Sequence, residues 1–212
     1  MSAIPATVRP VAEQVLATTL ARPPALPGTR LLCVDGPAGS GKTTLAAVLA
    51  DLAAEHGPVD LLHMDDMLEG WAGLPGVLPR AAVDLVGPLR AGRPGSYRRY
   101  DWAAGRFAET RTVDPVDVLV LEGVGSGGSA YDDAITTLVW VEVPRDLRLA
   151  RGIQRDGEQV RAHWLAWMED EDAVHARERT KVRADVLVDG TGGTAPQFRE
   201  PVLRQRAGRS ST

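Results

Sequence analysis

Residues 36–43 read Gly36-Pro37-Ala38-Gly39-Ser40-Gly41-Lys42-Thr43, which matches the pattern G-x-x-x-x-G-K-[ST] in full. An apolar run at 31–34 precedes this stretch, and a segment of helical character at 42–56 follows it. Glycines let the backbone curl so that successive N–H groups point inward at phosphate oxygens, and the start of the helix adds positive potential. We therefore predict a phosphate-binding loop that extends to Thr44, rather than a glycine-rich turn that binds nothing.

Two side chains of this loop have defined roles in such a motif. Lys42 would reach the β- and γ-phosphates of a nucleoside triphosphate, and the hydroxyl of Thr43 would bind Mg²⁺. The loop by itself predicts nucleotide binding and leaves open what is done with the nucleotide.

Strands and helices alternate along the rest of the chain. Apolar runs predict buried strands at 31–34, 59–64, 116–121, 137–143 and 184–188, and helical spacing predicts helices at 10–21, 42–56, 145–155 and 159–179. These strands lack polar alternation, so we predict an α/β fold of the P-loop NTPase type. It has a parallel five-stranded sheet with helices on both faces and a short lid. The segment 68–112 is rich in Gly, Pro and Arg, and we expect it to be loop apart from a helical piece at 81–91.

We expect a single domain, because 212 residues suffice for one core. Its parts would be an N-terminal helix and connector at 1–28, the core at 29–190 and a flexible tail at 191–212, where Gly, Pro, Arg and Ser dominate.

Composition narrows the class of protein. The formal net charge is −4, with 24 basic and 28 acidic side chains, which argues against a nucleic-acid-binding surface. No apolar run approaches the roughly 20 residues of a membrane span, and we expect no secretory signal at the N-terminus. A single cysteine, Cys33, excludes an internal disulfide and suits a reducing compartment. We therefore predict a cytoplasmic protein without a membrane or nucleic-acid partner.

Carboxylates follow two of the predicted strands. Glu122 comes directly after the strand at 116–121, where an acid can organise Mg²⁺ beside a phosphate loop; the alternative is a glutamate that caps a turn. Asp65 and Asp66 follow the second strand. A carboxylate there can face the γ-phosphate and accept the proton of an acceptor hydroxyl, although aspartate pairs also form turns.

Arginines recur in the predicted helix at 145–155. Arg148, Arg151 and Arg155 are spaced by three and four residues and therefore share one face. Arginines that converge on a transferred phosphate stabilise its charge, and the alternative is a solvated face.

Aromatic and basic residues cluster in the loop-rich segment. Such a mixture can stack a ring and pair with an anion, or it can be a surface turn. Trp71 either lines the acceptor pocket that this cluster would face or fills the core. The members of the cluster are Tyr97, Arg98, Arg99, Tyr100, Trp102 and Arg106.

The order of these motifs resembles that of the uridine kinase-like P-loop kinases, a group that also includes nicotinamide riboside, pantothenate and phosphoribulose kinases. The resemblance spans about 31–190, most of the chain. It rests on the phosphate loop, Asp65, Tyr100-Asp101-Trp102, Glu122-Gly123, the arginine pattern from Asp146 to Asp156, and Ala184-Asp185-Val186.

This resemblance implies roles for individual residues. Asp65 matches the catalytic carboxylate of the family, and Lys42 and Thr43 match the residues that hold ATP and Mg²⁺. Arg151 and Arg155 match arginines of the lid that clamp phosphates when the site closes. Tyr100 lies where the family has a Pro-x-Tyr-Asp-Phe segment that helps to hold the nucleoside.

The sequence also departs from the family. Asp66-Met67-Leu68-Glu69-Gly70-Trp71 stands where aromatic residues usually follow the catalytic aspartate, and 103–106 lacks the histidine of the nucleoside kinases. Gly157-Glu158 replaces a basic lid loop. These differences predict an acceptor pocket unlike that of a standard uridine kinase.

We therefore predict an ATP- and Mg²⁺-dependent kinase that transfers the γ-phosphoryl group to the hydroxyl of a small molecule. The catalytic residues would be Asp65, Lys42, Arg151 and Arg155. Trp71, Tyr97, Arg98, Arg99, Tyr100 and Glu122 would contact the acceptor. Two alternatives remain, a nucleoside monophosphate kinase that uses Arg98 and Arg99, and a regulatory module that binds a nucleotide without catalysis. Whether the protein forms a homo-oligomer is left open.

Overall fold

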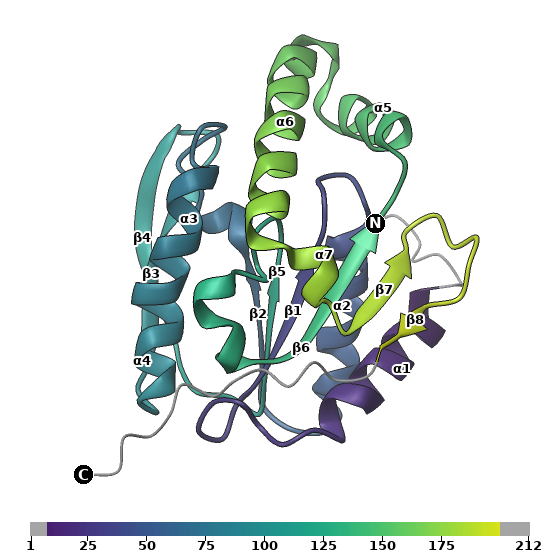
Figure 1. The fold of residues 1–212 in the computed structure, drawn as a ribbon. Coiled ribbons are helices and arrows are strands. Elements are labelled where there is room, and N and C mark those ends of the chain that lie inside the picture. The colour runs from purple at the N-terminus through teal and green to yellow at the C-terminus, as the bar shows by residue number, and fades with distance from the viewer. Residues whose placement is uncertain (1–7, 200–212) are drawn as a thin grey trace.

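A computed structural model describes residues 8–199, and its centre is a six-stranded sheet in the order β2-β5-β1-β6-β7-β8 (Figure 1). Five strands run parallel, as predicted, and β8 is added antiparallel at the edge. The strands are β1 (Arg30–Asp35), β2 (Val59–His63), β5 (Val118–Glu122), β6 (Ile135–Glu142), β7 (Val186–Asp189) and β8 (Gln197–Phe198).

Both faces of the sheet are covered, because alternate residues of each central strand enter different apolar clusters. Leu31 and Cys33 of β1 pack on one side, whereas Leu32 and Val34 pack on the other. The second side is covered by α1 (Val8–Leu20) and α2 (Lys42–Ala53). This two-sided burial explains the continuous apolar runs and confirms the predicted layers.

The remaining helices lie mainly on the first side and above the sheet. Figure 1 shows α6 and α5 rising over the carboxyl ends of the strands. The full set of remaining helices is α3 (Leu74–Arg80), a π-helical turn (Ala81–Val86), α4 (Gly87–Arg90), α5 (Arg145–Asp156), α6 (Arg161–Glu178) and α7 (Thr180–Arg183). Short 3-10 turns span Met64–Met67, Ser129–Ala134 and Glu158–Val160.

The segment expected to be loop contains an antiparallel hairpin of β3 (Gly95–Asp101) and β4 (Arg106–Val113). Tyr97 and Tyr100 are buried, while Arg98 and Arg99 turn outward. The expectation of a loop was wrong here. Strands were predicted from apolar runs, and strands with so many polar and charged residues contain none. The helical piece expected at 81–91 corresponds to the π-helical turn and α4.

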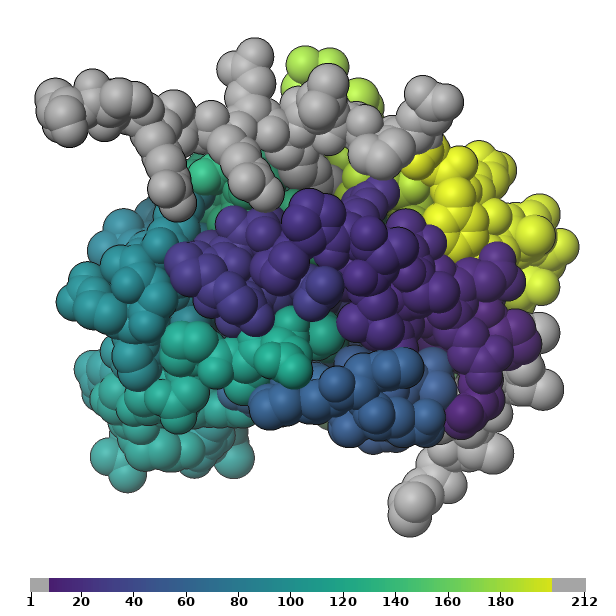
Figure 2. All heavy atoms as spheres, turned by 90° about the horizontal axis from the view of Figure 1, so that it is seen from below, coloured from purple at the N-terminus to yellow at the C-terminus, as the bar shows by residue number. Residues whose placement is uncertain are grey.

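The C-terminal segment returns to the sheet. Residues 191–199 fall in the expected flexible tail, yet β8 pairs with β7 through Val186 and Phe198, so this part of the expectation does not hold. Seen from below, the yellow C-terminal segment lies beside purple α1 (Figure 2). Residues 1–7 and 200–212 lie outside the described part of the chain. Within 8–199, no helix is both long and apolar enough to cross a membrane.

The buried strand β1 gives a direct test of this packing. We expect Leu32→Ala to lower the free energy of unfolding by about 2–5 kcal/mol, because Leu32 is fully buried and its truncation leaves a cavity. Leu147→Ala, on the exposed side of α5, should change it by less than about 0.5 kcal/mol. Urea unfolding measures both, and equal losses would contradict the arrangement.

Candidate active site

A cavity of about 1100 Å³ opens at the carboxyl ends of the parallel strands. The phosphate loop forms its floor, and Asp65, Glu122, Arg151 and Arg155 contribute to its lining. Open parallel sheets bind ligands at this edge, since the loops that follow their strands converge there. The structure therefore brings together all four residues proposed for catalysis and both proposed for the metal.

The loop between β1 and α2 takes backbone conformations that glycine adopts without strain. Gly36 has φ +137°, and a Cβ atom at this position would lie 2.1 Å from the carbonyl oxygen of Val141. Gly41 has φ +97° and immediately precedes the first residue of α2, Lys42. The buried Lys42 ammonium donates a hydrogen bond to the carbonyl of Pro37 at 3.0 Å, across the concave side of the loop.

Thr43 and Glu122 meet beside the loop. The Thr43 hydroxyl donates to Glu122 Oε1 at 3.2 Å, and Nδ1 of His63 lies 2.6 Å from the same oxygen. His63 and Glu122 are paired in register between β2 and β5, which explains their contact. Sequence reasoning did not single out His63, because only the parallel register shows that it faces Glu122.

The arrangement of Thr43 and Glu122 is compatible with Mg²⁺ binding. The ion prefers oxygen ligands, and it is commonly held by one or two protein side chains together with substrate phosphates. No group of three or more acidic, histidine or cysteine side chains that could hold a metal by itself occurs within residues 8–199. One hydroxyl and one carboxylate beside a phosphate loop fit an ion that is shared with a nucleotide.

Asp65 lies on the 3-10 turn that follows β2. Its side chain is open to the cavity, but the surrounding protein desolvates it and the charge of Glu122 lies nearby. Both effects raise the pKa of Asp65 above its ordinary value, and the positive charges of Lys42 and Arg155 oppose them in part. The indole N–H of Trp102 donates to the backbone carbonyl of Asp65 at 3.1 Å and thereby holds the turn.

The three arginines of α5 do not share one environment. Arg151 donates to the carbonyl of Gly39 at 3.2 Å, and Arg155 pairs with Asp156 beside the ring of Trp164. Arg148 instead turns inward to a buried ion pair with Glu171 of α6, at 2.6 Å. Arg151 and Arg155 therefore line the cavity, whereas Arg148 does not, because α6 supplies a buried partner for it.

Four indoles form one end of the cavity, and we call them the tryptophan wall: Trp71, Trp102, Trp164 and Trp167. Trp71 is at its centre, with its ring 5.9 Å from Trp102, 6.2 Å from Trp164 and 6.1 Å from Trp167. The sequence predicted that Trp71 lies either in the pocket or in the core. Its side chain both lines the cavity and packs against the core. Trp164 and Trp167 were missed as lining residues because their helical spacing is also that of a core.

The aromatic and basic cluster of β3 lies elsewhere. Tyr97 and Arg98 line a small separate cavity of about 200 Å³, and Arg98 lies over the ring of Phe107. Arg99 pairs with Glu109 across the hairpin, and Tyr100 packs edge-on against Trp102 behind the wall. None of these four lines the main cavity, whereas Trp102 of the same hairpin does.

The other end of the cavity was not anticipated from the sequence. It is lined by the start of α1, with Val8 and Val11, and by the loop 190–196 between β7 and β8. Asp189 shapes this loop by accepting hydrogen bonds from the backbone and hydroxyl groups of Thr191 and Thr194. The available signal was the carboxylate at the end of the last core strand, followed by Gly-Thr.

Asp35 fixes the start of the phosphate loop. Its buried carboxylate accepts from the backbone N–H groups of Gly36, Gly125 and Gly127 at 2.7, 3.0 and 2.8 Å, and from His175 of α6 at 3.2 Å. Burial disfavours the ionised form, but His175 and the amides outweigh it, so that the pKa of Asp35 is held below its ordinary value.

Comparisons with known proteins show a similarity to kinases. A curated uridine kinase from Lactobacillus helveticus is 26% identical over 145 residues, which cover 59% of this chain and 67% of that protein. A solved structure described as a possible uridine kinase from Bacillus stearothermophilus is 24% identical, with a TM-score of 0.64 over 86% of this chain and 99% of the other.

A second solved structure, described as a candidate kinase of a fructose transport system from Silicibacter sp. TM1040, has a TM-score of 0.53 at 25% identity. It covers 82% of this chain and 88% of that chain. No protein-family model matches the chain.

The fold and site define the class as a P-loop phosphotransferase. Within that class the chain is similar to the uridine kinase-like kinases, as the order of its motifs predicts.

The network around Asp35 predicts a pH-dependent contribution to stability. Because the folded pKa is lowered, this contribution is present above the unfolded pKa, about 3.9, and is lost as the pH falls through the folded value. Asp35→Asn should therefore cost about 1–3 kcal/mol at pH 7, since its amide N–H₂ opposes backbone donors. Urea unfolding between pH 7 and about pH 3 should show the gap to wild type narrowing. A constant gap would contradict this role.

Proposed function

We propose that the protein is an ATP- and Mg²⁺-dependent kinase that transfers the γ-phosphoryl group to a hydroxyl of a small molecule. One observation carries this proposal: the phosphate loop and Asp65 line the same cavity. A nucleotide held by the loop and an acceptor beside Asp65 would then react within one enclosed space. A cytoplasmic location is part of the proposal, because a single cysteine suits a reducing compartment.

The nucleotide would occupy the end formed by α1, the phosphate loop and residues 190–196. The loop amides and Lys42 would bind the β- and γ-phosphates, and Thr43 with Glu122 would hold Mg²⁺. When bound, Mg²⁺ neutralises phosphate charge. Arg151, which already reaches the backbone of Gly39, is close enough to the loop to stabilise the transferred group.

The acceptor would lie between Asp65 and the tryptophan wall. Asp65 would accept the hydroxyl proton as the oxygen attacks the γ-phosphorus, and its raised pKa makes it a stronger base than an ordinary aspartate. Indole surfaces suit a flat ring, so a nucleoside-like acceptor is favoured. The similarity to a protein named uridine kinase supports the same class.

Two observations count against the alternatives, which are a nucleoside monophosphate kinase and a regulatory module without catalysis. A nucleoside monophosphate kinase would need Arg98 and Arg99 at the acceptor phosphate, and neither residue lines the main cavity. A regulatory module that binds a nucleotide has no use for a carboxylate of raised pKa beside the phosphate loop.

Asp65→Asn tests the base directly. We expect kcat to fall about 10²–10⁴-fold, because the amide cannot accept the proton, while ATP affinity stays within about twofold. Asp66→Asn is the matched control on the same turn and should lower kcat far less. Lys42→Ala should have the converse effect and weaken ATP binding. Full turnover by Asp65→Asn, or equal losses at Asp65 and Asp66, would contradict the assignment.

The tryptophan wall predicts which substitutions change acceptor affinity. Trp71→Ala should raise the KM of the acceptor about tenfold or more through lost stacking, with the KM of ATP nearly unchanged. Arg98→Ala should change neither constant, because its side chain lies at the separate cavity. Steady-state kinetics with each substrate varied in turn distinguishes the two. A larger effect of Arg98→Ala would revive the monophosphate alternative.

A further inference from the structure

One face of α6 extends from the tryptophan wall to the phosphate loop. Trp164, Trp167 and Glu171 are spaced by three and four residues and so lie on the same side of this helix. The two indoles line the cavity, and Glu171 lies one turn further along, against Ala38. The mechanism described above uses neither Glu171 nor its ion-pair partner Arg148.

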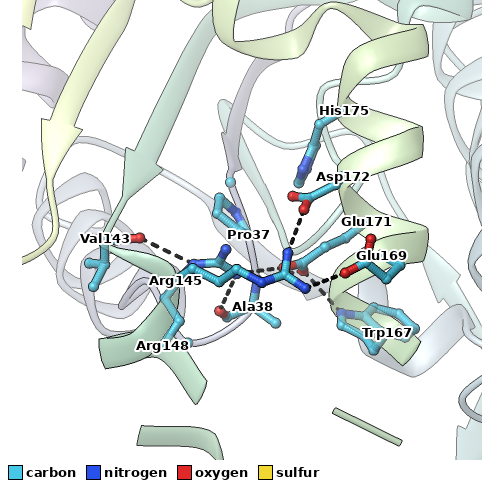
Figure 3. Close-up of polar contacts among 12 residues, drawn as sticks. Pro37, Ala38, Val143, Arg145, Arg148, Trp167, Glu169, Glu171, Asp172 and His175 are labelled. Carbon is cyan, nitrogen blue, oxygen red and sulfur yellow. Dashed lines mark hydrogen bonds and ion pairs between the residues drawn. The ribbon is translucent and has the colours of Figure 1, made fainter. Parts of the chain in front are cut away.

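Glu171 joins these two regions through a single oxygen atom. Its Oε2 accepts the backbone N–H of Ala38 at 2.7 Å and the indole N–H of Trp167 at 3.1 Å (Figure 3). Its side chain is fully buried, so no water competes for these bonds. A loop amide and an indole of the wall therefore share one acceptor.

Arg148 holds the carboxylate in this orientation. It donates to Glu171 Oε1 at 2.6 Å, and its guanidinium also reaches the carbonyl oxygens of Val143 at 3.2 Å and Ala38 at 3.4 Å. Each oxygen of Glu171 therefore has a fixed set of donors, and the carboxylate cannot rotate without breaking an ion pair. A movement of Ala38 or of Trp167 is therefore either transmitted to the other residue through the carboxylate or opposed by the ion pair with Arg148.

We propose that Glu171 is a positioning residue that couples the tryptophan wall to the phosphate loop, so that nucleotide binding at the loop changes the wall on which the acceptor rests. When the loop closes on phosphate and Ala38 moves, Oε2 moves with its amide and the hydrogen bond to Trp167 changes. Because coupling free energies are reciprocal, acceptor binding against Trp167 also changes the affinity of the loop for nucleotide. This inference rests on the proposed function, since it requires a nucleotide in the loop.

The same pair of helices offers a matched control. Arg145 of α5 pairs with Asp172 of α6 at 2.7 Å and with Glu169, and both acids are exposed (Figure 3). These ion pairs join α5 to α6 at the surface and involve neither the loop nor the wall. Asp172→Asn therefore removes a charge from α6 next to Glu171 without breaking the proposed connection.

The test follows the indole N–H of Trp167 by nitrogen–proton NMR while Mg²⁺ and a non-hydrolysable ATP analogue are added to the full chain. The signal is assigned by its loss in Trp167→Phe. We expect a shift of this resonance in the wild type and in Asp172→Asn, and loss of the shift in Glu171→Leu, whose side chain accepts from neither donor. Calorimetry on the same samples shows whether each variant binds the analogue.

Two results would overturn the coupling while leaving the proposed function intact. One is an unmoved Trp167 resonance in wild type that binds the analogue, and the other is an unchanged shift in Glu171→Leu. Failure of the wild type to bind the analogue would instead overturn the proposed function, and the coupling with it.

Trp167→Phe provides a second test that does not depend on how well Glu171→Leu folds. It keeps an aromatic ring and the buried ion pair but removes the indole donor, so the resonance of the Ala38 backbone N–H should shift even without nucleotide. An Ala38 resonance at its wild-type position would contradict the shared hydrogen bond.

Discussion

The parallel register of β2, β5 and β1 is the constraint on which the site depends. Glu122 is paired with Val34 on one side and with His63 on the other, so the ends of three strands meet at one edge of the sheet. The phosphate loop, Glu122 and the turn with Asp65 follow directly from those ends. A shift of one residue in either pairing would turn Glu122 to the opposite face and separate it from Thr43.

The second constraint is the arrangement of α6 over this edge. His175 bonds to Asp35 at the end of β1, Glu171 bonds to the loop, and Trp164 and Trp167 form part of the wall. One helix thus contacts the strand that starts the loop, the loop itself and the tryptophan wall at one end of the cavity. This arrangement is the physical basis for the proposed coupling between the tryptophan wall and the phosphate loop, and it places the buried ion pair of Arg148 and Glu171 beside the site.

Local sequence signals predicted the sheet and the phosphate loop, because both are encoded by adjacent residues. The continuous apolar runs gave five strands, and the glycine pattern gave the loop. The hairpin of β3 and β4 could not be predicted in the same way, since the pair Arg98 and Arg99 separates its tyrosines and leaves neither an apolar run nor a strict alternation. The inward direction of the Arg148 side chain could not be predicted from the sequence either. Helical spacing defines the face on which Arg148 lies, but the partner of Arg148, Glu171, belongs to a different helix. Ala38 and Glu171 are 133 positions apart, a separation that no local pattern bridges.

The most direct measurement of the central claim is phosphorus NMR of the purified protein with ATP and Mg²⁺, against matched nucleosides, nucleoside monophosphates and other small alcohols. The account predicts that one alcohol gains a phosphate monoester as ADP forms, and that its monophosphate counterpart is not phosphorylated. Transfer only to a monophosphate, or ATP binding without transfer to any compound in the panel, would contradict a kinase that acts on a hydroxyl group.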